Sequence, residues 1–262
     1  MTFAVSIHEG VATFTLDNPP QNRLSPDVLF GFAAGLEQVK TDETVRVVVV
    51  RARGENFSYG GDITFWPQIT PEQMGEMLGQ ALSILEVFET LPVPVIAAVQ
   101  GDCFGGGFEV ALRADVIIAT ESARFRHPEA TLGVITLLGG VQRVAERAGR
   151  ARAARWALTT EIVSAADALA AGVIAEVVAD DALALATTRW THMLARGATR
   201  AHAAHKRLLD AWATSGVQSA DKLIPEMATE LLRTRDAQRG ITSAVEALSK
   251  GTDRPDLEFV GR

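Results

Sequence analysis

Cysteine is nearly absent from this 262-residue sequence, in which Cys103 is the only one. A single cysteine excludes an internal disulfide framework and any zinc site built from several thiolates. Long apolar runs are also lacking, since a stretch such as PVIAAV is far too short to span a bilayer. The opening residues MTFAVSIHEG contain no basic segment, so no signal peptide is predicted. We therefore expect a cytoplasmic protein that does not enter a membrane.

An excess of positive charge is missing too, because the net charge is −7 and the isoelectric point is about 5.3. A surface that binds nucleic acid normally shows a basic face, so no nucleic-acid partner is expected. Apolar residues make up 47% of the chain and charged residues 22%, as is ordinary for globular proteins. The length predicts one large domain, or a core with a smaller appendage, that can bury a substantial interior.

The first half of the chain reads as strands that alternate with helices. The run VRVVVVRA is typical of a strand that is buried on both faces. Ser25 before Pro26 and Thr70 before Pro71 are typical of helix starts, and the second helix must end at the prolines of PVP. The predicted strands are 11–16, 45–52, 95–99 and 115–120, and the predicted helices are 25–39 and 70–91.

After about residue 140 the pattern becomes helical. Ser164 and Asp167 have capping-box spacing at the start of a short alanine-rich helix, and nearly everything after Asp180 has helical periodicity. No low-complexity linker separates the two halves. The sequence therefore predicts an α/β core over residues 1–195, which holds the active site, and a helical C-terminal region over 196–262. That region can pack on its own core or on another subunit.

Residues 101–109, GDCFGGGFE, place three glycines between a predicted strand and a predicted helix. Glycine is costly inside regular elements, so a triplet indicates positive φ or a close backbone approach. Free N–H groups at a helix start can bind a phosphate or an oxyanion, although close strand–helix packing also explains such glycines. Neither the G-x-G-x-x-G spacing of dinucleotide sites nor the lysine of a Walker A motif is present.

A second glycine pair lies in YGGD, residues 59–62, again after a strand. One interpretation is a tight turn in which Asp62 caps the next helix. The other is that Gly61 offers a second N–H to the same oxygen, because acyl chemistry needs two donors to hold a developing enolate. The residue pattern leaves both open.

Two glutamates accompany these loops. Glu109 lies in a first helical turn, where pairing with the helix dipole alone would explain it, and Glu129 has the plain alternative of a solvated loop carboxylate. If both face one pocket, they can act as general acid and base. His127 is expected to be structural, and Cys103 to be a small buried residue. No cluster has the spacing of metal ligands, so no metal or redox cofactor is expected.

Together these segments resemble the crotonase superfamily, the enoyl-CoA hydratase/isomerase proteins. The resemblance runs from about Val11 to about Leu248 and is carried by NPPQNRLS, ENFSYGGDI, PVIAAVQGDCFGGGFEVALRADVIIAT, ARFRHPEATLGV, GGVQRV and SAADALAAGVIAEVV. It implies an α/β spiral of repeated ββα units with a C-terminal helical trimerisation region. It also implies a homotrimer or a dimer of trimers, and a coenzyme A thioester as substrate.

The resemblance further implies roles for single residues. Gly61 and Gly106 match the residues whose backbone N–H groups hold the thioester oxygen. Glutamate stands at both positions associated with hydratases, which favours addition of water to the 2,3 double bond of an enoyl-CoA. Glu109 would then deprotonate the water, and Glu129 would protonate the α-carbon. The candidates for substrate binding are Arg23, Tyr59, Gly60, Asp62, Trp66 and Leu137.

Two departures from the family pattern leave the acyl group open. ITLLGG replaces a frequent Ile-Pro-Gly run, so Leu137 and its neighbours are expected to reshape the acyl end of the pocket. Trp66 lies close to a frequent lysine position, and could line an apolar acyl site. Arg23, with help from HKRLL of a neighbouring subunit, is the candidate for the coenzyme A phosphates, because an acidic chain needs a local basic patch.

Other functions stay open on the same scaffold. A double-bond isomerase or a thioester hydrolase shares the oxyanion hole and differs in where the acid and base lie. A non-catalytic CoA-thioester or RNA-binding member is the alternative from a different class. The acidic isoelectric point counts against RNA binding, and the two glutamates count against an inactive member.

Overall fold

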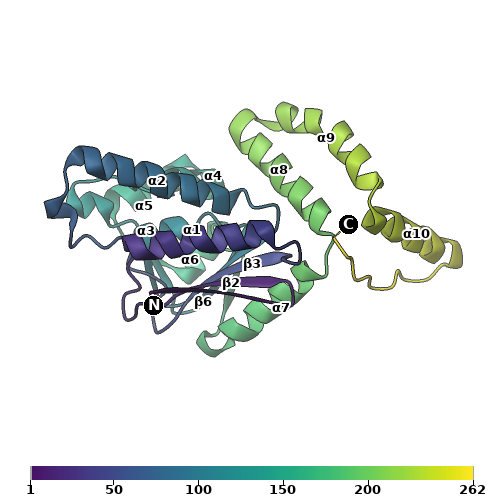
Figure 1. Cartoon of the computed structure of the whole chain (residues 1–262), viewed down its shortest axis with the longest axis horizontal. Coiled ribbons are helices and arrows are strands. Elements are labelled where there is room, and N and C mark those ends of the chain that lie inside the picture. Colours follow the sequence, from purple (N-terminus) through teal and green to yellow (C-terminus); the bar gives the residue numbers. More distant parts are fainter. Residues whose placement is uncertain (1, 262) are drawn as a thin grey trace.

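A six-stranded sheet forms the centre of the core in the computed structural model, which describes residues 2–261 (Figure 1). The strand order is β1-β2-β3-β4-β6-β9, in which β1 and β2 are antiparallel and all other neighbours are parallel. The strands are β1 (Phe3–His8), β2 (Val11–Leu16), β3 (Val47–Ala52), β4 (Val95–Val99), β6 (Val116–Thr120) and β9 (Glu176–Val178).

A second, smaller sheet has the order β5-β7-β8, with bounds Asp102–Phe104, Arg124–Arg126 and Val163–Ser164. β4 leads into β5 and then into α3 (Gly106–Ala111), and β6 leads into β7 and then towards α4 (Gly140–Ala148). These are repeated ββα units, each with one strand in either sheet. After β3, an isolated bridge between Ser58 and Cys103 takes the place of the second strand before α2 (Pro71–Glu89).

The main helices and strands confirm the sequence predictions, with small shifts at their ends. Ser25 accepts a hydrogen bond from the Val28 N–H at the start of α1 (Pro26–Thr41), and Thr70 forms a capping box at the start of α2. Valines of β3 point alternately to two hydrophobic clusters. One cluster contains Val48 and lies under α1 and α2, and the other contains Val47 and packs against α7 (Leu183–Ala195). The valine run is thus buried on both faces.

Several elements were not predicted individually. β1, β5, β7, β8 and β9 were missed, and β9 lies in the stretch after α6 (Ala165–Ala170) in which only a helix and its stop were predicted. Most of these strands have two or three residues, which is too short for an alternating pattern to be visible. The remaining helices of the core are α5 (Arg150–Thr159) and three short 3₁₀ turns at Trp66–Gln68, Glu129–Leu132 and Asp180–Ala182.

Helices α8 (Thr199–Ser215), α9 (Val217–Leu232) and α10 (Arg235–Lys250) extend beside the core (Figure 1). α8 is attached to the core by Lys206, whose Nζ lies 2.7 Å from Asp115 Oδ2 and 3.1 Å from the Val93 carbonyl oxygen. Lys206 of the HKRLL stretch is therefore bound inside its own chain. Among residues 2–261, no helix combines the length and the apolar character that crossing a membrane requires. The division at residue 195 stays a prediction.

Candidate active site

One cavity of about 380 Å³ brings together segments that are far apart in the sequence. Because β3, β4 and β6 are parallel, the loops that follow them emerge at one edge of the sheet. Most of the predicted site residues line this cavity, and only Gly60 lies behind its surface. The lining includes Glu109, Glu129, Gly61, Gly106, Arg23, Tyr59, Asp62, Trp66 and Leu137.

Two glycines of the cavity lining have backbone N–H groups without an acceptor in the described chain. Within residues 2–261, neither the Gly61 nor the Gly106 N–H donates a hydrogen bond to another group of the chain. The two loops touch, because a methyl group added to Gly106 would lie 3.4 Å from the Gly61 nitrogen. Gly60 has φ +86°, and a methyl group there would lie 2.8 Å from the Gly106 nitrogen. The approach that brings the two donors together therefore requires glycine.

Glycine is required at the other two positions of the triplet, 105 and 107, for separate reasons. Gly105 has φ +51°, a region that L side chains rarely adopt. Gly107 packs against the preceding loop, since a methyl group on it would lie 2.7 Å from the Ser58 carbonyl oxygen. Close packing thus explains Gly107, and Gly106 combines a close approach with a backbone N–H that has no acceptor in the described chain, while oxyanion binding there stays a prediction.

Glu109 is buried in α3 and is 2% exposed. Its Oε1 accepts hydrogen bonds from the Leu138 N–H and the Gly140 N–H, each at 2.8 Å. Burial and the nearby charge of Glu129 raise the pKa of Glu109 to about 7, although the two N–H donors and Arg113 act in the opposite direction. A carboxyl with a pKa near neutrality can both take up and release a proton at physiological pH.

Glu129 opens the 3₁₀ turn after β7 and is 8% exposed, so it is not the solvated loop carboxylate of the plain alternative. Within the described chain, neither of its oxygens has a hydrogen-bond partner. Burial raises its pKa to about 6. His127 Nδ1 lies 3.9 Å from Glu129 Oε2, but burial lowers the pKa of His127 to about 4, so the imidazole is neutral and forms no ion pair near pH 7.

Tyr59, Asp62 and Arg23 line the cavity with polar groups that already form hydrogen bonds within the chain. The Tyr59 hydroxyl donates to Asp102 Oδ2 at 2.7 Å, and Arg23 Nη1 donates to the Gly61 carbonyl oxygen at 3.2 Å. Asp62 does not cap a helix, contrary to one sequence prediction. Its Oδ1 instead accepts from the N–H and the hydroxyl of Thr64 in a local turn.

The lining of the cavity is largely apolar. Trp66 and Leu137 contribute to it, and the first turns of α2 add Met74, Met77 and Leu78. These three residues form one helical stripe with Ala81, Leu85 and Phe88, which lie in buried positions of the same helix. The stripe therefore lines the cavity at its N-terminal end and packs in the core at its C-terminal end.

The turn that supplies the donors to Glu109 was not predicted. Gly139 has φ +90°, and a methyl group on Gly140 would lie 2.9 Å from Glu109 Cγ and 2.4 Å from His127 Cε1. The double glycine before α4 is the signal that marks this close approach. Cys103 is fully buried in β5 outside the cavity, as expected. Among residues 2–261, no three His, Cys, Asp or Glu side chains are grouped so that they could hold a metal ion.

Comparison with known proteins identifies the family. Residues 6–251 match the family model described as enoyl-CoA hydratase/isomerase. A Bacillus subtilis protein named "Probable enoyl-CoA hydratase" is 29% identical over 93% of this chain and 95% of its own length. The 2,3-dehydroadipyl-CoA hydratase of Escherichia coli is 29% identical, with coverage of 92% and 94%, and the carnitinyl-CoA dehydratase of Salmonella enteritidis is 32% identical, with coverage of 82% of both chains.

Solved structures agree in fold. The enoyl-CoA hydratase from Bacillus anthracis superimposes with a TM-score of 0.89 at 26% identity, and the match covers 100% of both chains. Pseudomonas aeruginosa DspI superimposes with a TM-score of 0.88 at 26% identity, covering 97% of this chain and 96% of the other. The chain therefore belongs to the enoyl-CoA hydratase/isomerase family of the crotonase superfamily and is an enzyme of hydratase or isomerase type.

Proposed function

We propose that this enzyme is a hydratase that adds water across the 2,3 double bond of an enoyl-CoA thioester. The observation that carries the proposal is the meeting of two buried carboxyls and two free backbone N–H groups in one cavity. Two acid–base groups with raised pKa values suit a reaction that both removes and delivers a proton. The N–H groups of Gly61 and Gly106 suit an oxygen that becomes negatively charged.

In the proposed reaction, the ionised Glu109 takes a proton from water while the water oxygen bonds to the β-carbon. The electrons of the double bond move to the thioester oxygen, which the Gly61 and Gly106 N–H groups stabilise as an enolate. Protonated Glu129 then delivers its proton to the α-carbon and the thioester carbonyl re-forms. One proton passes from Glu109 back to Glu129 before the next cycle, so the carboxyl pair is unchanged overall.

The different surroundings of the two carboxyls support this division of roles. Glu109 accepts two N–H hydrogen bonds, which favour its ionised form, whereas the oxygens of Glu129 accept none from the described chain. The charge of Glu129 also contributes to the raised pKa of Glu109. A proton on Glu129 removes that contribution, which lowers the pKa of Glu109 and favours the ionised form that acts as the base.

The substrate-binding roles of Arg23, Tyr59, Gly60, Asp62, Trp66 and Leu137 belong to the same proposal. No metal or redox cofactor is required, and coenzyme A enters as part of the substrate. A homotrimer or a dimer of trimers is also proposed, since α8 to α10 expose apolar side chains that a neighbouring subunit would cover. These include Leu209, Trp212, Ile224, Leu232, Ile241, Val245 and Leu248. A cytoplasmic location stays a prediction.

Turnover of crotonyl-CoA and of longer and branched enoyl-CoA thioesters tests the proposal. Loss of the conjugated enone absorbance reports hydration. We expect Glu109→Gln and Glu129→Gln each to reduce kcat/KM by about 10²-fold or more, because each glutamate moves a proton. Glu121→Gln, which alters an exposed carboxylate outside the cavity, is the matched control. If the wild-type enzyme binds these thioesters but hydrates none, the hydratase proposal is wrong, and double-bond isomerisation and thioester hydrolysis are assayed next.

A further inference from the structure

The two donors to Glu109 come from one short turn, residues 138–140, which we call the 138–140 turn. The Gly140 N–H and the Gly139 carbonyl belong to the same peptide unit, which is planar and rigid. This unit donates to Glu109 Oε1 at 2.8 Å from its nitrogen and accepts from Arg143 Nη1 at 3.0 Å on its oxygen. Whatever fixes the Arg143 guanidinium therefore fixes the direction of the N–H that reaches Glu109.

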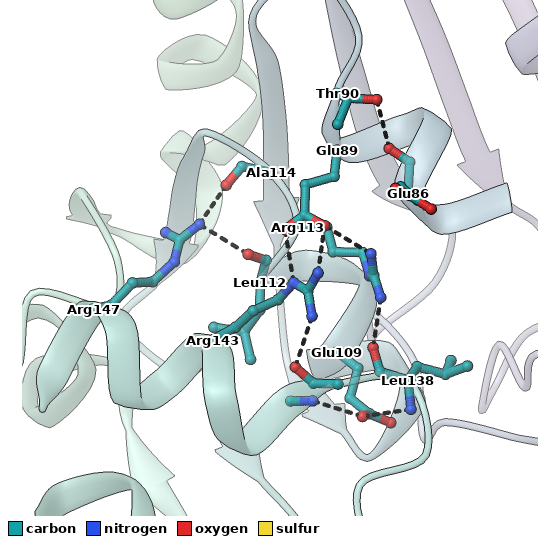
Figure 2. A network of polar contacts seen from close by, with 12 residues as sticks. Glu86, Glu89, Thr90, Glu109, Leu112, Arg113, Ala114, Leu138, Arg143 and Arg147 are labelled. Atoms are coloured by element: carbon teal, nitrogen blue, oxygen red, sulfur yellow. Dashed lines mark hydrogen bonds and ion pairs between the residues drawn. The ribbon is translucent and has the colours of Figure 1, made fainter. Parts of the chain in front are cut away.

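A second guanidinium lies on the same turn. Arg113 Nη2 donates to the Leu138 carbonyl oxygen at 2.8 Å (Figure 2). The Arg113 side chain is 3% exposed and that of Arg143 is 17% exposed, so two like charges are held together with little water between them. We call Arg113 and Arg143 the arginine pair. Two such cations need a negative partner to stay in place.

Glu89 is that partner. Its Oε2 accepts from Arg113 Nη1 at 2.8 Å and also from Arg143 Nη2, and its Oε1 accepts from Arg143 Nε at 2.7 Å. Glu89 is the last residue of α2, the helix whose first turns line the cavity. Figure 2 shows Glu89 on one side of the arginine pair and Glu109 on the other. The contacts form a continuous chain from the end of α2 to the proposed base.

We propose that Glu89 is a positioning residue for Glu109, acting through Arg143 and the rigid Gly139–Gly140 peptide unit. The proposal rests on the proposed function, in which Glu109 takes the proton from water. Glu89 holds the arginine pair against the turn carbonyls, and the turn then keeps its N–H groups directed at Glu109. Those hydrogen bonds favour the ionised carboxylate that the reaction needs.

Direct electrostatics and positioning predict opposite effects for the loss of the Glu89 charge. If Glu89 acted on Glu109 only through space, removal of a negative charge would lower the pKa of Glu109. If Glu89 positions the turn, the same removal loosens the N–H donors and raises the pKa of Glu109. The charged or titratable groups next to Glu109 are Glu129, Arg113 and His127, and Glu89 and Arg143 lie beyond Arg113 in the same network.

Two variants and one control test this inference. Glu89→Gln keeps the size of the side chain but weakens its hydrogen bonds to both members of the arginine pair. Arg143→Lys leaves every charge in place but removes the planar fork that spans Glu89 and the Gly139 carbonyl. Arg147→Lys is the control, because Arg147 lies one turn further along α4 and donates to the Leu112 and Ala114 carbonyls, not to the turn.

The pKa of Glu109 is read from the ¹³C signal of its carboxyl, assigned by difference from Glu109→Gln, and turnover is measured beside it. We expect the pKa to rise by about one unit in Glu89→Gln and in Arg143→Lys, since charge-favouring hydrogen bonds weaken. At pH 7 this corresponds to about a fivefold loss of kcat with little change in KM. Arg147→Lys should leave both quantities unchanged.

A fall or no change in the Glu109 pKa in Glu89→Gln would overturn the proposal, and so would equal behaviour of Arg143→Lys and Arg147→Lys. If Glu89→Gln does not fold, the charge-neutral comparison of the two lysine variants still decides the outcome. The NMR titration needs no turnover. Failure of the wild-type enzyme to hydrate any enoyl-CoA would therefore refute the proposed function without deciding the role of Glu89.

Discussion

Carboxylates beside the core and in the cavity have two opposite kinds of surroundings in this molecule. Asp115 is joined to the Lys206 ammonium at 2.7 Å and to the Val95 N–H at 2.7 Å, and this cluster attaches α8 to the core. Glu109 accepts only two backbone N–H groups, and Glu129 accepts nothing from the rest of the described chain. Where α8 is attached to the core, the charge of the Asp115 carboxylate is paired with the Lys206 ammonium. In the cavity the carboxylate charge is left largely uncompensated, and the carboxyls can exchange protons near neutral pH.

Removal of the Glu109 charge should therefore increase the free energy of unfolding at high pH although it reduces activity. The pKa of Glu109 is raised from 4.5 to about 7, so the folded state holds the carboxyl proton more tightly than the unfolded chain does. The stability that this proton contributes is full below pH 4.5 and is lost as the pH rises through 7. We expect Glu109→Gln to be more stable than the wild-type enzyme at pH 8 by on the order of 3 kcal/mol, and by only about 1 kcal/mol at pH 5. Urea unfolding at the two pH values measures the difference.

The opposite result is expected at the compensated cluster. Lys206→Met leaves the partly buried Asp115 carboxylate without its cation, which should lower the free energy of unfolding by about 2–3 kcal/mol. The residual kcat of the folded protein should be unaffected, because Lys206 lies outside the cavity. Lys222→Met, at an exposed position of α9, is the control. Equal stability of the two variants would contradict the contrast between the two kinds of carboxylate.

The two carboxyls in the cavity should also influence one another. Because the charge of Glu129 contributes to the raised pKa of Glu109, Glu129→Gln should lower the Glu109 pKa by up to about one unit. The ¹³C titration described above measures this shift directly. An unchanged Glu109 pKa would mean that burial alone accounts for it and that the two groups titrate independently.

Cys103 offers the smallest expected effect and a third case, a titratable group that is buried without any chemical use. Burial raises the pKa of its thiol, with a further contribution from the Asp102 charge. We expect a thiol reagent to leave the native protein unmodified at pH 8 and to modify one group per chain in denaturant. Rapid labelling of the native protein would show that the β5 region opens.

The features that could be predicted from the sequence are those that depend on residues close together along the chain. The valine run of β3, the caps of α1 and α2, and the need for glycine at the positive φ of Gly105 all follow from local steric and hydrogen-bonding rules. The roles assigned to single site residues came from the family resemblance and stay predictions. The arginine pair was not foreseen, because its contacts join residues 89, 113, 138 and 143, and only the folded chain brings these together.

Helix α2 concentrates its cavity residues in its first half and its core residues in its second half. Met74 and Met77 line the cavity and Leu85 and Phe88 are buried in the core, whereas Ala81 between them does both. Gly75 and Gly79 lie between them with open space where a side chain would be. Mutations in the first turns can therefore accumulate with little loss of stability. This gives natural variation, or directed evolution, a way to change the preferred acyl group while the acid–base machinery stays untouched.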